Sequence, residues 1–465
     1  MSSTYTHLSA SERLARRIPS LLAAWRASSP APRRPQGNVA ALSPNEVKGA
    51  AASLLALQRG LTGARELAGS GYMERQALLG AYLLYYWPVS YIEVSLILEE
   101  LRPLLPGSPR RVLDLGCGPG PGAAALLDAG AEELMLADSS AQALDLAKTL
   151  LESDGASPEG RQVRTVYHRL DIESGGPLPE GPYDLILLAH ALNELWKDEP
   201  DRQARRLAVL ERIAGLLSPD GLLVVVEPAL LATSRETLAL RDELAAAGYA
   251  IAAPCPGSYP CPALAAGPSR TCHLDTAWEP PEPVASLAAA AGLDRQSVKC
   301  SWFALRPVAA PHRPSATDPA PADHAPADSA STDPAPSPSR AVLTAASQPG
   351  RLAGGVLAGG VLAGARVVSE TLLNKAGRLR IFLCAECRLT GLSAARDDRR
   401  ARELGFFDLR RGDVITVEGA EPRPGGGLGI GMDTRLSLDR RAPRPEGNKA
   451  ADHRRPSGRG DRRAR

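Results

Sequence analysis

The chain has 465 residues, of which 44% are hydrophobic, and its 54 basic and 52 acidic residues leave a net charge of +2. This length allows two or three domains with hydrophobic cores, and the small net charge excludes a protein that is a polycation over its whole surface. The best apolar stretch, around residues 81–98, is interrupted by Pro88 and Glu93 and falls short of the ~18 residues needed for a membrane span, so we expect a soluble protein without a membrane partner.

The cysteine count and the N-terminal composition bear on the compartment. Seven cysteines, an odd number in a chain without a secretory signal, favour a reducing environment over a disulfide framework. Residues 1–34 are rich in arginine with Glu12 as their one acid, which is typical of organelle transit peptides. We expect the bacterial cytoplasm, or the mitochondrion if the source is eukaryotic.

Residues 1–105 are predicted to form an N-terminal helical region. Serines precede helix-like stretches at residues 12–25 and 45–67, and Pro19 predicts a break in the first of them. An aromatic stretch follows at residues 82–91. Because no basic residues are interspersed there, core packing is favoured over stacking on nucleic-acid bases.

From residue 106 to residue 306 the pattern changes to short apolar runs alternating with helix-like segments. The runs are 111–115, 134–138, 165–170, 185–189 and 222–226, with helix-like segments at 123–129, 141–151 and 203–217 and a late strand at 298–305. Buried strands alternating with helices predict an α/β domain with a doubly wound parallel sheet.

The rest of the chain divides into three parts. Residues 307–365, dominated by Pro, Ala and Gly, predict a disordered linker. Strand-like runs in 366–438 predict a small β-rich module, and 439–465 form a tail with ten basic and four acidic residues. Such a tail can contact phosphates, although basic ends are more often simply solvated.

A glycine-rich loop follows the first apolar run of the α/β domain. In Asp114-Leu-Gly116-Cys-Gly118-Pro-Gly120 the glycines are spaced as GxGxG after an acid. A dinucleotide-binding loop has GxGxxG instead, so this spacing favours a class I, Rossmann-like methyltransferase fold that binds S-adenosylmethionine (SAM).

Three acids and one apolar residue complete the predicted SAM site. Asp114 is expected at the methionine end of the cofactor and Asp138 at the ribose hydroxyls. Asp171 and Ile172 are expected beside the adenine. The predicted cofactor residues are therefore Asp114, Gly116, Gly118, Gly120, Asp138, Asp171 and Ile172.

Catalytic residues are weakly indicated. The fourth-strand run continues into His190 and Asn193, where a class I enzyme holds its methyl acceptor. His190 is a candidate general base, but a structural role in shaping the pocket or capping the next helix is favoured for both residues.

Cysteines interleaved with prolines follow the α/β pattern. Cys255, Cys261 and Cys272 lie in a segment whose prolines prevent a regular helix, which is typical of thiolates that hold a soft metal. A fourth ligand has to come from elsewhere. Candidates are Cys384, Cys387 and Cys300, and the sequence does not distinguish zinc from iron–sulfur.

Together these motifs resemble the methyltransferase-like assembly proteins of the small ribosomal subunit, which occur in mitochondria and bacteria. The motifs that carry the resemblance are residues 114–120, 191–195 (Ala-Leu-Asn-Glu-Leu), 226–228 (Val-Glu-Pro) and the cysteine segment with its prolines. The resemblance covers most of residues 80–305 and, more weakly, 366–415.

The resemblance implies a [4Fe–4S] cluster held by Cys255, Cys261, Cys272 and, as the best fit for the fourth position, Cys384. It also implies a SAM-binding, methyltransferase-like protein that acts in small-subunit assembly and translation through rRNA binding. Two alternatives stay open: a catalytically active SAM-dependent rRNA methyltransferase, and a cluster-based redox or iron sensor.

Overall fold

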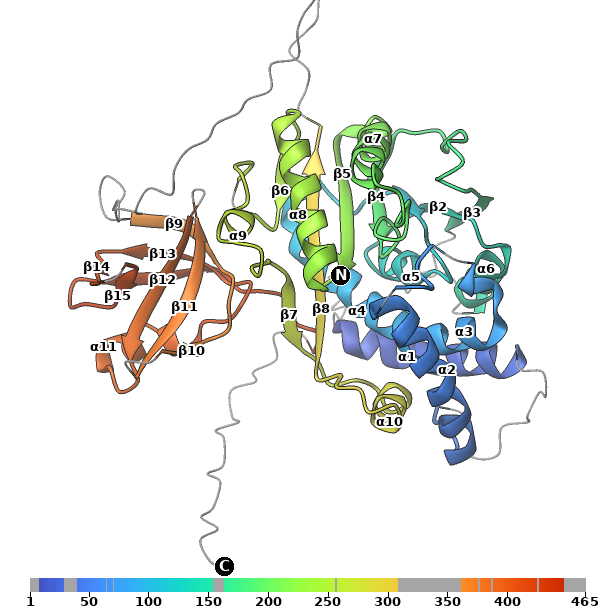
Figure 1. The fold of residues 1–465 in the computed structure, drawn as a ribbon, viewed down its shortest axis with the longest axis horizontal. Helices are drawn as coiled ribbons and strands as arrows, with labels where there is room; N and C mark the ends of the chain where they lie inside the picture. Colours follow the sequence, from blue (N-terminus) through green and yellow to red (C-terminus); the bar gives the residue numbers. More distant parts are fainter. Residues whose placement is uncertain are drawn as a thin grey trace, which may run out of the picture.

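The structure, a computed structural model, contains two β-sheets, and helices surround the first of them (Figure 1). It describes residues 8–28, 40–63, 65–69, 71–153, 163–255, 257–307, 361–374, 377–385, 388–424 and 426–446.

The N-terminal region is helical. Its elements are α1 (Ala10–Ala27), α2 (Pro44–Thr62), η1 (Tyr72–Glu74), α3 (Gln76–Ala81), the π-helical η2 (Tyr82–Tyr86), α4 (Trp87–Leu101) and η3 (Arg102–Leu104). Capping boxes start both α1 and α2: the hydroxyls of Ser9 and Ser43 accept backbone N–H groups of the first turn, and a glutamate three residues on reaches back.

The break predicted at Pro19 is wrong, because α1 continues through this residue. A proline inside a helix removes one backbone hydrogen bond and costs about 3 kcal/mol. Buried Leu14, Ile18, Leu21 and Leu22 anchor the helix on both sides of Pro19 against the core. Tertiary packing therefore offsets the local cost.

Among the described residues, one helical stretch, Gln76–Leu104, is long and apolar enough to cross a membrane by length and composition. Its most apolar part is 89% buried inside the protein. That burial is what a core helix shows, and Trp87, Tyr91 and Ile97 of α4 are each almost fully covered by the surrounding chain.

The first sheet has the strand order β3-β2-β1-β4-β5-β8-β6, and β7 pairs with β8. Its strands are β1 (Arg111–Leu115), β2 (Glu133–Asp138), β3 (Arg164–Arg169), β4 (Tyr183–Ala189), β5 (Leu217–Pro228), β6 (Ala250–Ala253), β7 (Leu274–Ala277) and β8 (Ser297–Arg306). The intervening helices are α5 (Pro121–Asp128), α6 (Ala141–Ser153), α7 (Arg202–Ala214), α8 (Leu231–Ala246), α9 (Pro262–Ala265) and α10 (Glu282–Ala290).

The sheet is mixed rather than wholly parallel. Strands β1 to β5 are parallel, as the alternation of strands and helices predicts, but β8 runs antiparallel to β5, β6 and β7. Many doubly wound sheets carry antiparallel strands at one edge. Both faces are covered, since Val112 packs into a core with α1 and α4 while its neighbour Leu113 packs into a second core with α7 and α8.

The second sheet has the order β14-β15-β12-β11-β9-β13-β16, and β10 pairs with β11. Its elements are β9 (Val361–Val367), β10 (Leu372–Leu373), β11 (Arg378–Ala385), β12 (Arg388–Ala395), α11 (Arg399–Glu403), η4 (Phe406–Asp408), β13 (Val414–Glu418), β14 (Glu421–Pro422), β15 (Leu428–Gly429) and β16 (Arg435–Arg440). We call this body the C-terminal module.

Two predicted boundaries differ from those of the module. Strand β9 begins at Val361, inside the range predicted as linker, because it pairs with both β11 and β13 and so lies within the sheet. Strand β16 runs to Arg440, two residues into the predicted tail. Residues 308–360 of the predicted linker and residues 447–465 of the tail lie outside the described residues.

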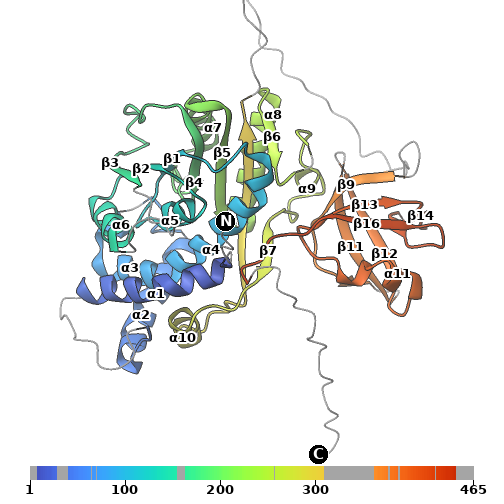
Figure 2. The same ribbon diagram turned by 180° about the vertical axis from the view of Figure 1, so that it is seen from behind.

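The C-terminal module lies beside the edge of the first sheet, next to α9 and β7, in both views (Figures 1 and 2). A buried ion pair joins the two bodies: the guanidinium of Arg366 on β9 meets the carboxylate of Glu100 on α4 through both of its terminal nitrogens. Arg411 donates to His273, and the backbone N–H of Ser11 donates to the carbonyl of Pro445 at 2.9 Å.

Candidate functional site

The glycine loop leads from β1 into α5. Gly116, Gly118 and Gly120 all have positive φ angles, of 72°, 52° and 78°, which L side chains rarely adopt. A Cβ on Gly116 would lie 2.4 Å from the Cβ of Ala191, in the segment after β4. At this position, therefore, only glycine lets the loop and the end of β4 approach each other.

Asp138, the last residue of β2, is held by the loop. Its carboxylate accepts the backbone N–H of Gly118 at 2.8 Å and that of Ser140 at 2.9 Å. Burial raises the pKa of Asp138, and these two N–H groups act in the opposite direction. These hydrogen bonds therefore hold the carboxylate of Asp138 between the glycine loop and the end of β2.

Asp114 lies beneath the loop. It is 2% exposed, and burial raises its pKa to about 7. Its Oδ2 atom has no hydrogen-bond partner among the described residues. Asp114 and Gly120 do not line the cavity described next.

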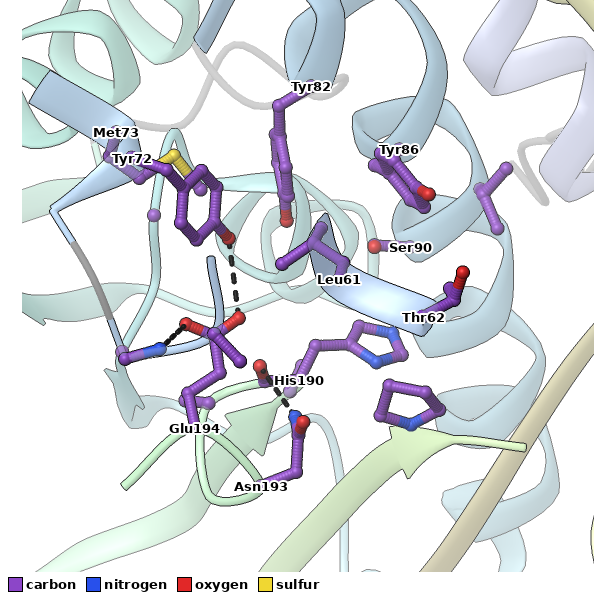
Figure 3. Close-up of a pocket in the computed structure, with 18 of the residues that line it drawn as sticks. Leu61, Thr62, Tyr72, Met73, Tyr82, Tyr86, Ser90, His190, Asn193 and Glu194 are labelled. Carbon is purple, nitrogen blue, oxygen red and sulfur yellow. Dashed lines mark hydrogen bonds between the residues drawn. The ribbon is translucent and has the colours of Figure 1, made fainter. Parts of the chain in front are cut away.

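A cavity of about 540 Å³ opens where the loop, the ends of β4 and β5, and the N-terminal helices meet (Figure 3). Of the residues predicted from sequence, it is lined by Gly116, Gly118, Asp138, Asp171, Ile172, His190 and Asn193. The structure therefore brings together seven of the nine predicted cofactor and catalytic candidates, from positions up to 77 residues apart in the chain.

Several lining residues were not predicted as site residues. They come from the N-terminal region and from the segment after β4: Leu61, Thr62, Tyr72, Met73, Tyr82, Tyr86, Ser90, Glu93 and Glu194. The aromatic stretch predicted to pack in the core thus also lines the cavity, where the π-helical turn η2 presents Tyr82 and Tyr86. A π-helical turn often marks a functional site, but no residue pattern in this chain identified it.

Glu194 closes one side of the cavity. Its carboxylate accepts the backbone N–H of Gly69 at 3.2 Å and the hydroxyl of Tyr72 at 3.4 Å (Figure 3). Burial raises the pKa of Glu194 to about 7. This carboxyl group therefore links Gly69 and Tyr72 to the segment that follows β4.

His190 stands at the opposite side of the cavity in a constrained conformation, with φ at 60°. Its Nε2 atom lies 2.8 Å from Oε2 of Glu93 on α4, and Asn193 donates to its carbonyl oxygen at 3.1 Å. Burial lowers the pKa of His190, but Glu93, with further help from Glu227 and Glu194, outweighs it and holds the pKa above its usual value.

The thiols of Cys255, Cys261, Cys272 and Cys384, which we call the thiol set, form a second group. Burial raises the pKa of Cys384 to about 12, and the charges of Cys272, Cys255 and Cys261 act in the same direction. The four side chains are thus near enough for their charges to interact, although Cys384 is on β11 and the other three lie between β6 and β7.

Three arginines surround the thiol set. The charges of Arg241 and Arg366 oppose the effect of burial on the pKa of Cys255, and those of Arg366 and Arg411 do the same for Cys272. Arg366 comes from β9 of the C-terminal module and Arg241 from α8. The arginines thus oppose the effect of burial without overcoming it, and the pKa of both Cys255 and Cys272 stays above its usual value.

The other candidate ligands are placed differently. Cys300 is fully buried on β8, and the charges that act on it are those of Glu93 and Glu100 rather than of the thiol set. Cys387 lies outside the described residues. In the described ranges, no three His, Cys, Asp or Glu side chains converge closely enough to hold a metal ion as they stand.

A family model agrees with these features. Residues 76–280 match Rsm22, described as mitochondrial small ribosomal subunit Rsm22. The resemblance to this family is therefore confirmed for these residues. The Rsm22 match includes the glycine loop, the cavity-lining end of β4, and the first three cysteines of the thiol set.

Solved methyltransferases are more distantly similar. A plantazolicin methyltransferase in complex with SAH is 12% identical over 56% of this chain and 98% of its own, with a TM-score of 0.31. A SAM-dependent methyltransferase of Leishmania major is 16% identical over 57% and 85%, with a TM-score of 0.32. A putative RNA methyltransferase of Pyrococcus horikoshii is 14% identical over 48% and 86%, with a TM-score of 0.29.

TM-scores of this size carry no argument about shared fold or function. No curated protein matches the chain.

Proposed function

We propose that this protein binds SAM in the cavity beside the glycine loop and acts as a methyltransferase-like factor of the small ribosomal subunit. One observation carries the SAM assignment: Gly116, Gly118, Asp138, Asp171 and Ile172 line a single cavity of about 540 Å³. This volume lies within the ~300–1,000 Å³ usual for small-molecule pockets.

We assign a role to each of these five residues. The backbone of Gly116 and Gly118 approaches the cofactor where a side chain would block it. Asp138 accepts the ribose hydroxyls, and Asp171 and Ile172 frame the adenine. A role for Asp114 at the methionine end stays a prediction, because this residue lies beneath the loop.

The small-subunit role rests on the Rsm22 match over residues 76–280. By extension we propose that rRNA is the partner and that the protein works in the bacterial cytoplasm or, in a eukaryote, in the mitochondrion. The basic tail predicted to meet phosphates lies mostly outside the described residues, so the proposal rests on the family and not on an RNA-binding surface.

We further propose that the thiol set holds a [4Fe–4S] cluster, with zinc as the alternative. The donor chemistry fits, since four thiols influence one another's charge and three guanidiniums offset the negative charge that such a site accumulates. When bound, the cluster supplies a four-thiolate cross-link between the first sheet's edge and β11 of the C-terminal module.

Titration calorimetry with S-adenosylhomocysteine, the demethylated product of SAM, tests the cofactor assignment. The wild-type protein is expected to bind one equivalent, and Gly118→Arg is expected to abolish binding because the new side chain enters the cavity. Gly248→Arg is the matched control: Gly248 also has a positive φ, of 99°, but open space around it. Equal binding by wild type and Gly118→Arg would refute the assignment.

A further inference from the structure

Part of the cavity lining is not used by the residues assigned to SAM. Met73 marks the cofactor side, because its Cε lies 3.7 Å from where a Cβ on Gly118 would stand. Tyr86, Ser90, Thr62 and His190 face the cavity on the other side (Figure 3). This second side of the cavity carries an aromatic ring, hydroxyl groups and the imidazole of His190.

We propose that this side of the cavity binds a small, planar molecule that carries a hydroxyl group, and that His190 accepts the hydroxyl proton as SAM methylates the oxygen. The proposal rests on the SAM assignment above and specifies the methyl acceptor. It makes His190 a catalytic residue and Glu93 the residue that positions it.

The contact between Glu93 and His190 indicates which ring nitrogen of His190 carries the proton. Glu93 is 2% exposed, and its Oε2 lies 2.8 Å from Nε2 of His190. A buried carboxylate accepts a hydrogen bond, so Nε2 carries the proton and Nδ1 is left with the lone pair. This is the arrangement in which a carboxylate orients a histidine base and stabilises the imidazolium that forms.

A histidine base next to the methyl acceptor is needed only if the acceptor has a proton to lose. A carboxylate or thiolate nucleophile carries no proton to remove, whereas a hydroxyl keeps its proton at neutral pH and needs a base. Acidic and basic side chains both line the cavity: Glu93 and Glu194 are acidic, and Arg295 and Lys299 are basic. The presence of a histidine base therefore favours a hydroxyl compound as the acceptor.

The wall of the cavity limits the shape and size of the acceptor. The rings of Tyr82 and Tyr86 are stacked, with centroids 5.8 Å apart and planes inclined by 29°. Aromatic walls favour flat, ring-containing ligands. Because the same 540 Å³ must also hold the cofactor, the acceptor is small.

The reaction balances without another reagent. The hydroxyl oxygen attacks the methyl carbon of SAM, the new C–O bond takes the oxygen lone pair, and the breaking C–S bond returns its electrons to sulfur. The sulfonium becomes the neutral thioether of S-adenosylhomocysteine, and the hydroxyl proton passes to Nδ1 of His190. Solvent then removes this proton.

Methyl transfer from radiolabelled SAM to catechol, a small planar hydroxyl compound, tests the proposal. We expect labelled product from the wild-type protein and a loss of about 10²- to 10⁴-fold in rate in His190→Gln. Glu132→Gln, at an exposed site outside the cavity, should keep the wild-type rate. All variants are first titrated with S-adenosylhomocysteine, which His190→Gln should still bind.

The pH profile separates a catalytic from a structural role. The rate should rise with pH as His190 loses its proton, and Glu93→Gln should move this rise to lower pH, because the carboxylate holds the pKa of His190 up. A merely structural role for Glu93 would lower the rate without moving the profile. If Glu93→Gln does not fold, the methylation rate of His190→Gln alone tests whether His190 is the base.

The two proposals fail in distinguishable ways. A wild-type protein that does not bind S-adenosylhomocysteine would refute the SAM assignment. Normal binding with no methylation of catechol, or with equal rates in wild type and His190→Gln, would refute the acceptor site and leave the SAM assignment intact.

Discussion

The ion pair between Arg366 and Glu100 is predicted to hold the C-terminal module onto the helical body. Both side chains are more than nine-tenths buried, at 9% and 2% exposure, and the second of their two hydrogen bonds measures 3.0 Å. Removing one partner of a buried pair costs about 3–5 kcal/mol, because the other charge is left without compensation in a poorly solvated place.

The structure predicts that the two single substitutions differ. Arg366→Met leaves Glu100 with the partly exposed Arg440, whose Nη2 lies 3.4 Å away, so the loss should be near 3 kcal/mol. Glu100→Leu leaves Arg366 buried without a carboxylate partner, so the loss should be near 5 kcal/mol. The double variant should lose less free energy of unfolding than the sum of the two single variants, since neither charge is then left without its partner.

Urea unfolding measured by circular dichroism gives the three free energies, and the exposed pair between Arg399 and Glu403 supplies the control. Breaking that surface pair should cost less than about 1 kcal/mol. Losses below about 1 kcal/mol for both Arg366→Met and Glu100→Leu, or strictly additive losses in the double variant, would refute this account of the interface.

Two further predictions concern the thiol set and pH. After anaerobic purification, Cys384→Ala should lose iron and sulfide while the buried control Cys300→Ala keeps them; equal metal content in both, or zinc in place of iron, would contradict the [4Fe–4S] proposal. The hydrogen bond from Arg26 lowers the pKa of Glu46 to about 2. The folded pKa of Glu46 lies below its unfolded value, so the pair with Arg26 stabilises the folded protein above about pH 4.5. As pH falls towards 2, the free energy of unfolding should decrease by about 1–2 kcal/mol. This decrease should be absent in Glu46→Gln when unfolding is followed between pH 6 and 2.

The cofactor side of the cavity could be predicted from sequence because its signals are local. Apolar runs end in Asp138 and in the glycine loop, and parallel strands bring their carboxyl ends to one edge of the sheet. The acceptor side could not be predicted in this way. Glu93 meets His190 across 97 residues, and nothing in either local pattern indicates the contact.

Other differences have similar physical causes. Pro19 does not break α1 because long-range packing outweighs local propensity, and β9 extends into glycine-rich sequence because two neighbouring strands pair with it. The antiparallel direction of β8 depends on the connections that precede it, which apolar periodicity does not encode. The cysteine segment was recognisable because prolines alternate with its cysteines, but the prediction that these prolines prevent a regular helix is wrong for one turn, since α9 begins at Pro262. The approach of Cys384 to this segment depends on how the module docks.

A crystal structure of the protein with S-adenosylhomocysteine bound would show whether the cofactor lies in the cavity beside the glycine loop. We expect the ribose hydroxyls on the carboxylate of Asp138, the adenine beside Asp171 and Ile172, and the sulfur on the side that faces His190. A ligand bound outside this cavity, or bound in it with the adenine against His190, would refute the proposed SAM site.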